Sequence, residues 1–365
     1  MAITLKGTLT GSLVPFSTVW GDPPVSVLIA SGSNLQKIES DTLSTIEDSP
    51  TCDIVLRKAG RVVVASSTND TLKYSGVGDE TNWTGDTSSD AVELEVGYQS
   101  GGTINGVVPM GNDLIVFKTD GTIYRVISEY PDWSVVEIGR NMYNLNRFSC
   151  IQMMNDVIFL DRFHGIRMIS AVQEYGDVKA GPFGEKINAT LVRELGEDCR
   201  MWYLPSRTEL WVKPDTGYKK VYVYSFFKNA WTTFTFPLEP ISAISVGIDC
   251  YVSVKAESDL HPEALVAVTD RDADGDFETD PIVTDVSMKV LPTRGTSALL
   301  GRLVVDLGGT GESSVLVNDV EIASLSGEGT IISRQGIIGR TLSIRILSES
   351  GRMSVRQVVV DYGEI

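Results

Sequence analysis

The sequence predicts an all-β protein: a β-propeller built from hairpin blades, followed by a C-terminal β-sandwich-like module. Short runs rich in β-branched and aromatic residues alternate with Gly, Asp, Asn and Ser turns about every eight to twelve residues, a spacing typical of sandwiches, barrels and propellers. The 34 Gly residues supply conformationally permissive turn positions. Apolar spacing of the helical kind is convincing only over residues 189–195.

The hairpin at 111–133 begins GNDLIVFKTDGTIYRVIS and defines the repeating element. Two apolar runs flank its turn, and Asp-Gly favours a two-residue turn because that turn requires positive φ angles. The order of strand, polar turn, strand, polar loop and aromatic residue recurs at 60–83, 155–175 and 208–231, and more weakly at 249–269. Four or five units at a spacing of roughly 40 to 55 residues indicate propeller blades.

Three of these units end in a tryptophan, at Trp83, Trp133 and Trp231. A blade is a small sheet that cannot bury both faces alone, so a large aromatic side chain near its outer strands would fill the wedge against the next blade. We therefore interpret the three Trp as blade-packing residues. Stacking on a ligand is the alternative, because an aromatic row is also typical of a sugar-binding surface.

From residue 281 onward the Trp residues and the hairpin motif are missing, and the segments alternate apolar and polar residues. This pattern indicates half-buried antiparallel strands; it is clearest where Leu342, Ile344 and Ile346 alternate with Thr341, Ser343 and Arg345. We therefore predict two domains. Residues 1–280 form the propeller with an N-terminal extension, and residues 281–365 form the sandwich-like module.

The most specific local motif is DRDADGDFE, which begins at Asp270. Carboxylates at alternate positions can converge on Ca²⁺ while Gly permits the sharp turn. The candidate ligands are Asp270, Asp272, Asp274 and Glu278. An EF-hand would need Glu at loop position twelve, where this chain has Pro281, so a calcium site here would be a hairpin loop. The alternative is a solvated acidic turn, and no other cofactor is expected.

Catalytic signatures are missing from the sequence, which lacks GxSxG, HExxH and GxxxxGK[ST]. His164 and His261 lie in expected loops without a recognisable nucleophile nearby. The four Cys are widely spaced without a CxxC pair, so we expect buried free thiols. We predict that the protein is not an enzyme; the alternative is a propeller hydrolase that uses scattered carboxylates.

The net charge of −17 argues against a nucleic-acid-binding protein, which would gather Lys and Arg into a basic stripe. No apolar run approaches the roughly 18 residues of a membrane helix. The beginning, MAITLKGTLTGSL, lacks the long apolar stretch of a secretory signal. We therefore expect no membrane span and a place on the cytoplasmic side when the chain is made.

The order of several motifs resembles the β-propeller tail proteins of short-tailed bacteriophages. LKYSGVGDETNW (72–83) is followed by AVELEVG (91–97) and by INGVVPMGNDLIVFKTDGTIYRV (104–126). In that family a GD…W turn leads into a strand, an I-x-G segment and a GN-x-L hairpin. RNMYNLNRFSCIQMMNDVIFLDRFHGIRMIS (140–170) resembles the following blade, and GIIGRTLSIRILSESGRMSVRQVVVDYGEI (336–365) resembles the terminal strands.

The resemblance covers most of residues 28–170 and 270–365, whereas residues 180–260 match less well. It implies a structural protein of the virion tail, assembled in the host cytoplasm as a homo-oligomeric, typically hexameric ring. Such a nozzle or tail tube lies below the portal and adaptor, beside tail fibre, spike or needle proteins, and it closes and later conducts the DNA channel. No residue of that family is catalytic.

The acidic composition suits such a conduit, because basic walls would trap DNA by neutralising its phosphates. DNA would then pass through the lumen during ejection without specific binding. The same acidic charge would also keep a subunit soluble before assembly, and both interpretations stay open. The alternative function is that of a carbohydrate- or receptor-binding β-propeller.

Overall fold

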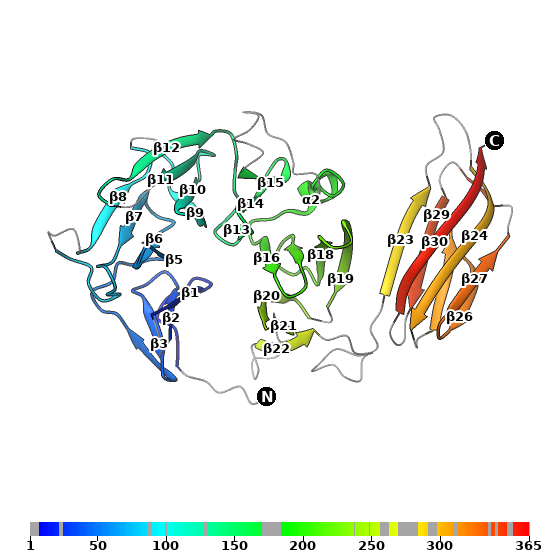
Figure 1. Cartoon of the computed structure of the whole chain (residues 1–365), viewed down its shortest axis with the longest axis horizontal. Helices are drawn as coiled ribbons and strands as arrows, with labels where there is room; N and C mark the ends of the chain where they lie inside the picture. The colour runs from blue at the N-terminus through cyan, green and yellow to red at the C-terminus, as the bar shows by residue number, and fades with distance from the viewer. Residues whose placement is uncertain are drawn as a thin grey trace. The chain divides into compact units, whose positions relative to one another are not determined.

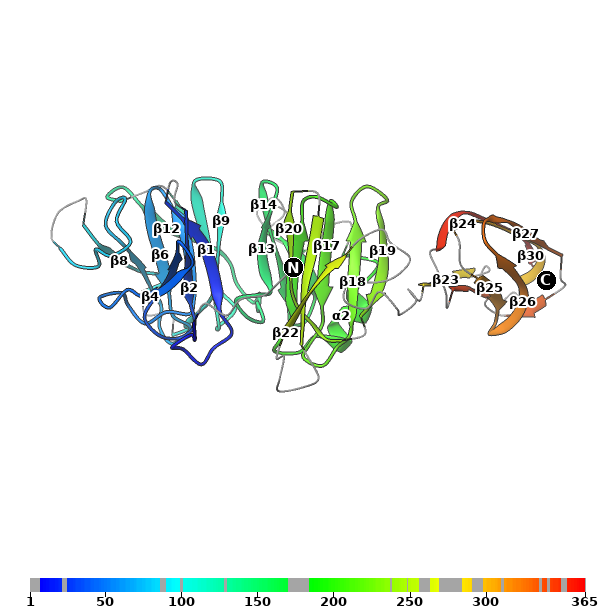
Figure 2. The same cartoon turned by 90° about the horizontal axis from the view of Figure 1, so that it is seen from below.

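The structure is a computed structural model of the chain, shown in Figures 1 and 2. It describes residues 7–21, 25–85, 90–98, 101–127, 130–169, 184–236, 238–247, 249–255, 263–268, 284–290, 298–309, 312–334, 337–339, 342–348 and 353–364. Two compact units divide the chain: Met1–Tyr203 with Leu210–Tyr218 and Asn229–Trp231, and Leu204–Glu209 with Lys219–Lys228 and Thr232–Ile365.

The predicted fold class is confirmed: the protein is all-β, with small antiparallel blade sheets and a C-terminal β-sandwich. The first sheet is β1 (Phe16–Trp20), β2 (Ser26–Ala30), β3 (Gln36–Glu39) and β4 (Thr42–Thr45). The second is β5 (Ile54–Lys58), β6 (Arg61–Ala65), β7 (Thr71–Tyr74) and β8 (Val92–Glu95). The third is β9 (Ile104–Met110), β10 (Asp113–Lys118), β11 (Ile123–Ile127) and β12 (Ser134–Gly139).

Three further meanders follow in the chain. The fourth sheet is β13 (Cys150–Met153), β14 (Asp156–Asp161) and β15 (Gly165–Met168), followed by helix α2 (Asn188–Glu194). The fifth is β16 (Arg200–Leu204), β17 (Glu209–Lys213), β18 (Lys220–Ser225) and β19 (Ala230–Thr235). The sixth is β20 (Pro240–Val246), β21 (Asp249–Lys255) and β22 (Glu263–Val268). Among the described residues, no helix is both long and apolar enough to cross a membrane.

The first four sheets pack side by side through three apolar clusters. One cluster joins the first and second sheets, another the second and third, and another the third and fourth. Every residue of β6 and β10 is buried, because a blade between two neighbours covers both faces of its middle strands. The first strands β1, β5, β9 and β13 contact one another in sequence, and Figure 1 shows β5, β9 and β13 on the inner side of this row.

The turn between β10 and β11 differs from the prediction. Of its residues only Gly121 has a positive φ, +81°, whereas a two-residue hairpin turn of the expected type needs two such residues. The turn is longer: the Lys118 N–H donates to the Thr122 carbonyl, and the Gly121 N–H to the Lys118 carbonyl. The Asp120 carboxylate accepts from the Thr122 N–H (3.0 Å) and hydroxyl (2.5 Å), which stabilises this conformation.

The C-terminal β-sandwich packs two sheets face to face around one core. One sheet has the order β23 (Thr284–Val290), β29 (Leu342–Ser348), β25 (Glu312–Val317) and β26 (Val320–Ser326). In the other, β24 (Ala298–Gly309) pairs with β27 (Gly329–Ser333), β28 (Ile337–Gly339) and β30 (Met353–Glu364). The alternation in β29 is as expected, with Leu342, Ile344 and Ile346 buried. The domain boundary at residue 281 stays a prediction, since residues 269–283 lie outside the described residues.

Candidate functional site: the Glu80 network and its neighbouring groove

The GDETNW turn lies between β7 and β8, and local hydrogen bonds fix its conformation. The Asp79 carboxylate accepts from the Thr81 N–H (2.9 Å) and hydroxyl (2.6 Å), as Asp does in tight turns. Gly76 is required for a different reason: a Cβ there would lie 2.8 Å from the Asn82 side chain. These features aim the Glu80 side chain at the first sheet.

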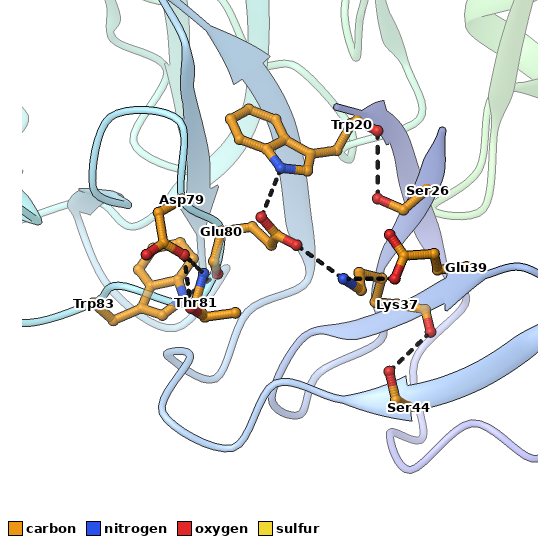
Figure 3. A network of polar contacts seen from close by, with 9 residues as sticks. All are labelled: Trp20, Ser26, Lys37, Glu39, Ser44, Asp79, Glu80, Thr81 and Trp83. Carbon is orange, nitrogen blue, oxygen red and sulfur yellow. Dashed lines mark hydrogen bonds and ion pairs between the residues drawn. The ribbon is translucent and has the colours of Figure 1, made fainter. Parts of the chain in front are cut away.

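Glu80 connects two strands of the first sheet, as Figure 3 shows. The indole N–H of Trp20, on β1, donates to Glu80 Oε2 at 2.8 Å. The ammonium of Lys37, on β3, donates to Glu80 Oε1 at 3.0 Å and lies 3.2 Å from the Glu39 carboxylate. The Glu80 backbone carbonyl in turn accepts from the indole N–H of Trp83 at 2.8 Å. The turn after β7 is therefore joined to the first sheet by two hydrogen bonds to the Glu80 carboxylate, one from Trp20 and one from Lys37.

Burial acts to raise the pKa of Glu80, since its side chain is only 15% exposed. Hydrogen bonds from a backbone N–H, Lys37 and Trp20 outweigh this effect, so the pKa of Glu80 lies below its ordinary value of 4.5. The hydrogen bond to Glu80 is the largest contribution that raises the pKa of Lys37 above its ordinary value of 10.5. Both shifts favour the charged pair.

Glu80→Gln should lower the free energy of unfolding by about 1–2 kcal/mol at pH 7, because one charge-assisted hydrogen bond and its charge are lost. A carboxylate with a depressed folded pKa contributes stability above its ordinary pKa of 4.5 and loses it as pH falls through the folded pKa. Urea unfolding at several pH values should therefore show that the difference in free energy of unfolding between the wild type and Glu80→Gln becomes smaller below about pH 4.5. Glu95→Gln, at an exposed position on β8, is the matched control and should change the free energy of unfolding little. A difference between the wild type and Glu80→Gln that does not vary with pH would contradict the prediction.

A groove of about 370 Å³ adjoins the network through Trp83. Asp48 and Pro50 line it from the segment after β4, and Lys73, Tyr74, Val92 and Glu93 line it from β7 and β8. Lys73 and Glu93 are a cross-strand ion pair at 2.5 Å. A smaller cavity of about 190 Å³ is lined by Trp20, Gly21, Arg57, Gly60 and Gly78.

A second cluster lies where the inner strands of the first unit begin; we call it the Arg147 cluster and define it as Phe16, Asp53, Arg147, Phe148 and Arg200. Arg147 lies 3.3 Å from the Asp53 carboxylate and donates to the Val14 carbonyl at 2.8 Å. The Phe148 ring stacks on Phe16 at 5.7 Å, with the Arg147 and Arg200 guanidinium groups 4.8 and 5.1 Å from its centre.

The Arg147 cluster connects residues next to β1, β5, β13 and β16. Burial lowers the pKa of Arg147; Asp53 opposes this shift and Arg200 adds to it. Asp53 is 1% exposed, and its carboxylate also accepts from the Ser67 N–H and hydroxyl at 2.9 and 2.5 Å. An ion pair, stacked rings and hydrogen bonds therefore link these strand ends to one another.

The predicted Trp residues occupy separate positions. Trp83 packs against the cluster between the first and second sheets, and Trp133 against the cluster between the second and third. Trp231 is half-buried on β19. Tyr74 lies near both Trp83 and Trp133: its ring is tilted against that of Trp133, with the centroids 5.1 Å apart, and it lines the groove with Trp83.

The predicted calcium ligands, Asp270 to Glu278, lie outside the described residues, as does His261. His164 lies on the turn after β14, with Nδ1 2.8 Å from the buried Asp161 carboxylate. The prediction of buried free thiols is confirmed, and burial raises the pKa of Cys52, Cys150 and Cys199 to about 12. No group of three potential metal-ligating His, Cys, Asp or Glu occurs in the part of the chain that the structure describes.

The sequence matches no protein-family model and no curated protein. Among solved structures, it is similar to a chain of the mitotic checkpoint complex, with 11% identity and a TM-score of 0.46 over 66% of this chain and 69% of that one. It is also similar to a chain of the nidogen/laminin complex (11% identity, TM-score 0.44, 69% and 89% covered). Dihydro-heme d1 dehydrogenase NirN gives 9% identity and a TM-score of 0.44, with 85% and 65% covered. Similarities this weak support no conclusion about function.

Proposed function

We propose that this chain is a structural subunit of the tail of a short-tailed bacteriophage. It would form a ring, the nozzle or tail tube, that closes and conducts the DNA channel below the portal and adaptor. The observation that carries the proposal is the order of motifs from GDETNW to GNDLIVF, which resembles that family. The contacts of these motifs support a structural role, since Glu80 fastens one sheet to the next and β10 lies buried between its neighbours.

The Arg147 cluster bears on the path of the DNA. Because its ion pair and stacked rings link the inner strand ends of the first unit to one another, DNA would not pass between those strands. The lumen would be built by several copies of the chain, in keeping with a homo-oligomeric ring. The propeller would then be a rigid wall rather than a channel in itself.

The distribution of charge agrees with a conduit that does not grip DNA. Residues 281–365 contain nine Asp or Glu and eight Lys or Arg, so this part carries −1 and residues 1–280 carry −16 of the total −17. Six copies would carry roughly −100 in all, which would repel the phosphate backbone and weaken adhesion.

Electron microscopy of purified virions tests the proposal. An antibody raised against this chain should label the tail and no other part of the particle. Light scattering of the purified chain should give a mass several times that of one subunit, with a hexamer expected. Virions without label would remove the structural role, and label on the capsid shell would contradict the place in the tail.

A further inference from the structure

We propose that the groove beside Trp83 binds a neutral pyranose, as the exposed end of a glycan. The groove, of about 370 Å³, falls within the range of roughly 300–1,000 Å³ of small-ligand sites. Its lining combines two aromatic residues with polar side chains, as a ligand with both C–H faces and hydroxyls requires. The inference concerns a further site and does not depend on the proposed tail function.

The aromatic side of the groove is held rigidly. The Trp83 indole N–H is fixed by the Glu80 carbonyl at 2.8 Å, and the indole packs against the cluster between the first and second sheets. Tyr74, 5% exposed, belongs to the cluster between the second and third sheets, with its ring tilted at 5.1 Å from that of Trp133. A rigid aromatic side chain gives contact area at low conformational-entropy cost, and the apolar C–H face of a pyranose suits such a ring.

The polar side supplies hydrogen-bonding groups for hydroxyls. Asp48 and Thr84 are exposed at the groove, and a carboxylate can accept from two neighbouring hydroxyls. Lys73 and Glu93, with side chains 35% and 62% exposed, form an ion pair that offers a donor and an acceptor side by side. Hydrogen bonds to charged groups are the stronger ones, which would give the site its orientation preference.

The charge of the lining selects the class of sugar. Asp48, Glu93 and Lys73 together carry −1, which disfavours a sugar with a carboxylate or phosphate group. The groove is open on one side, so binding should be weak, with a millimolar Kd. We therefore infer a neutral hexose or N-acetylhexosamine rather than a uronic or sialic acid.

Saturation-transfer difference NMR of the purified full chain tests this site. The probes are the methyl glycosides of glucose, galactose, mannose, N-acetylglucosamine and glucuronic acid. At least one neutral glycoside should receive saturation on its C–H face, and methyl glucuronide should receive less. Asp48→Asn should weaken binding of the responding glycoside about tenfold, from the loss of a charge-assisted hydrogen bond.

Matched variants distinguish a loss of sugar binding in the groove from a loss of folding or a change elsewhere on the protein. Trp83→Phe should keep part of the binding and Trp83→Leu should lose it, with circular dichroism to check that each variant folds. Asp319→Asn, on an exposed turn of the sandwich, and Phe227→Ala, at a side chain 90% exposed, should leave binding unchanged. The inference is overturned if no neutral glycoside binds, if the glucuronide binds best, or if Asp48→Asn and Trp83→Phe bind like the wild type. None of these outcomes depends on where the chain lies in a virion.

Discussion

Asp53→Ala should lower the free energy of unfolding by about 3–5 kcal/mol, because it leaves a largely buried guanidinium without its carboxylate. Asp53 is 1% exposed, and the Arg147 side chain is 14% exposed. The substitution also removes the acceptor for the N–H and hydroxyl of Ser67. Unsatisfied buried donors cost free energy of their own, so the loss should exceed that of a surface ion pair.

A double-mutant cycle measured by urea unfolding tests this prediction. Arg147→Ala alone should also destabilise the protein, and the double variant should be less destabilised than the sum of the two by about 1–3 kcal/mol. Asp132→Ala, an exposed change of the same kind, should stay within about 0.5 kcal/mol of the wild type. Strictly additive losses at Asp53 and Arg147 would show that the two side chains do not act as a pair.

The same cycle bears on how the first unit is held together. Asp53 precedes β5 and Arg147 precedes β13, so the pair joins sheets that are not consecutive in the chain. The Arg147 contact with the Val14 carbonyl adds the segment before β1. Weakening the pair should therefore loosen the inner end of several sheets together, rather than one hairpin.

Local structure was predictable because its causes lie close together in the sequence. The repeating hairpins follow from alternating apolar runs and turn residues, and the buried alternation in β29 follows from its period of two. The β10–β11 turn shows the limit: Asp-Gly predicted its position, but the hydrogen bonds from Thr122 to Asp120 decided its length. Turn propensities of residue pairs do not account for such local hydrogen bonds between a side chain and the backbone.

The contacts between sheets could not be predicted, because their partners are far apart in sequence. Glu80 meets Lys37 across 43 residues and Trp20 across 60, and Arg147 meets Asp53 across 94. A single sequence shows that these side chains are charged or can donate a hydrogen bond, but not which faces meet once the blades stack. The role of Glu80 within the GDETNW turn likewise depends on the geometry of the first sheet, which the sequence alone does not show.

Trp133→Ala should lower the free energy of unfolding by about 3–5 kcal/mol, the range for removing a large aromatic side chain from a packed site. Trp133 packs against the apolar cluster that joins the second and third sheets, with its ring 5.1 Å from Tyr74 and 5.3 Å from Tyr130. Because Trp133 is only partly buried, we expect the loss at the lower end of that range. Trp133→Phe should recover part of it, since a smaller ring can still contact the Tyr74 ring.

Phe227→Ala is the matched control for Trp133→Ala, because it removes an aromatic side chain that is 90% exposed and should cost less than about 0.5 kcal/mol. Thermal and urea unfolding of both variants would distinguish the loss of a packed aromatic side chain from the loss of an exposed one. A large loss at Trp133 with none at Phe227 would assign Trp133 to the seam between two blades. Equal and small losses would instead leave the Trp133 ring available for stacking on a ligand, the alternative that an aromatic row in the sequence also allows.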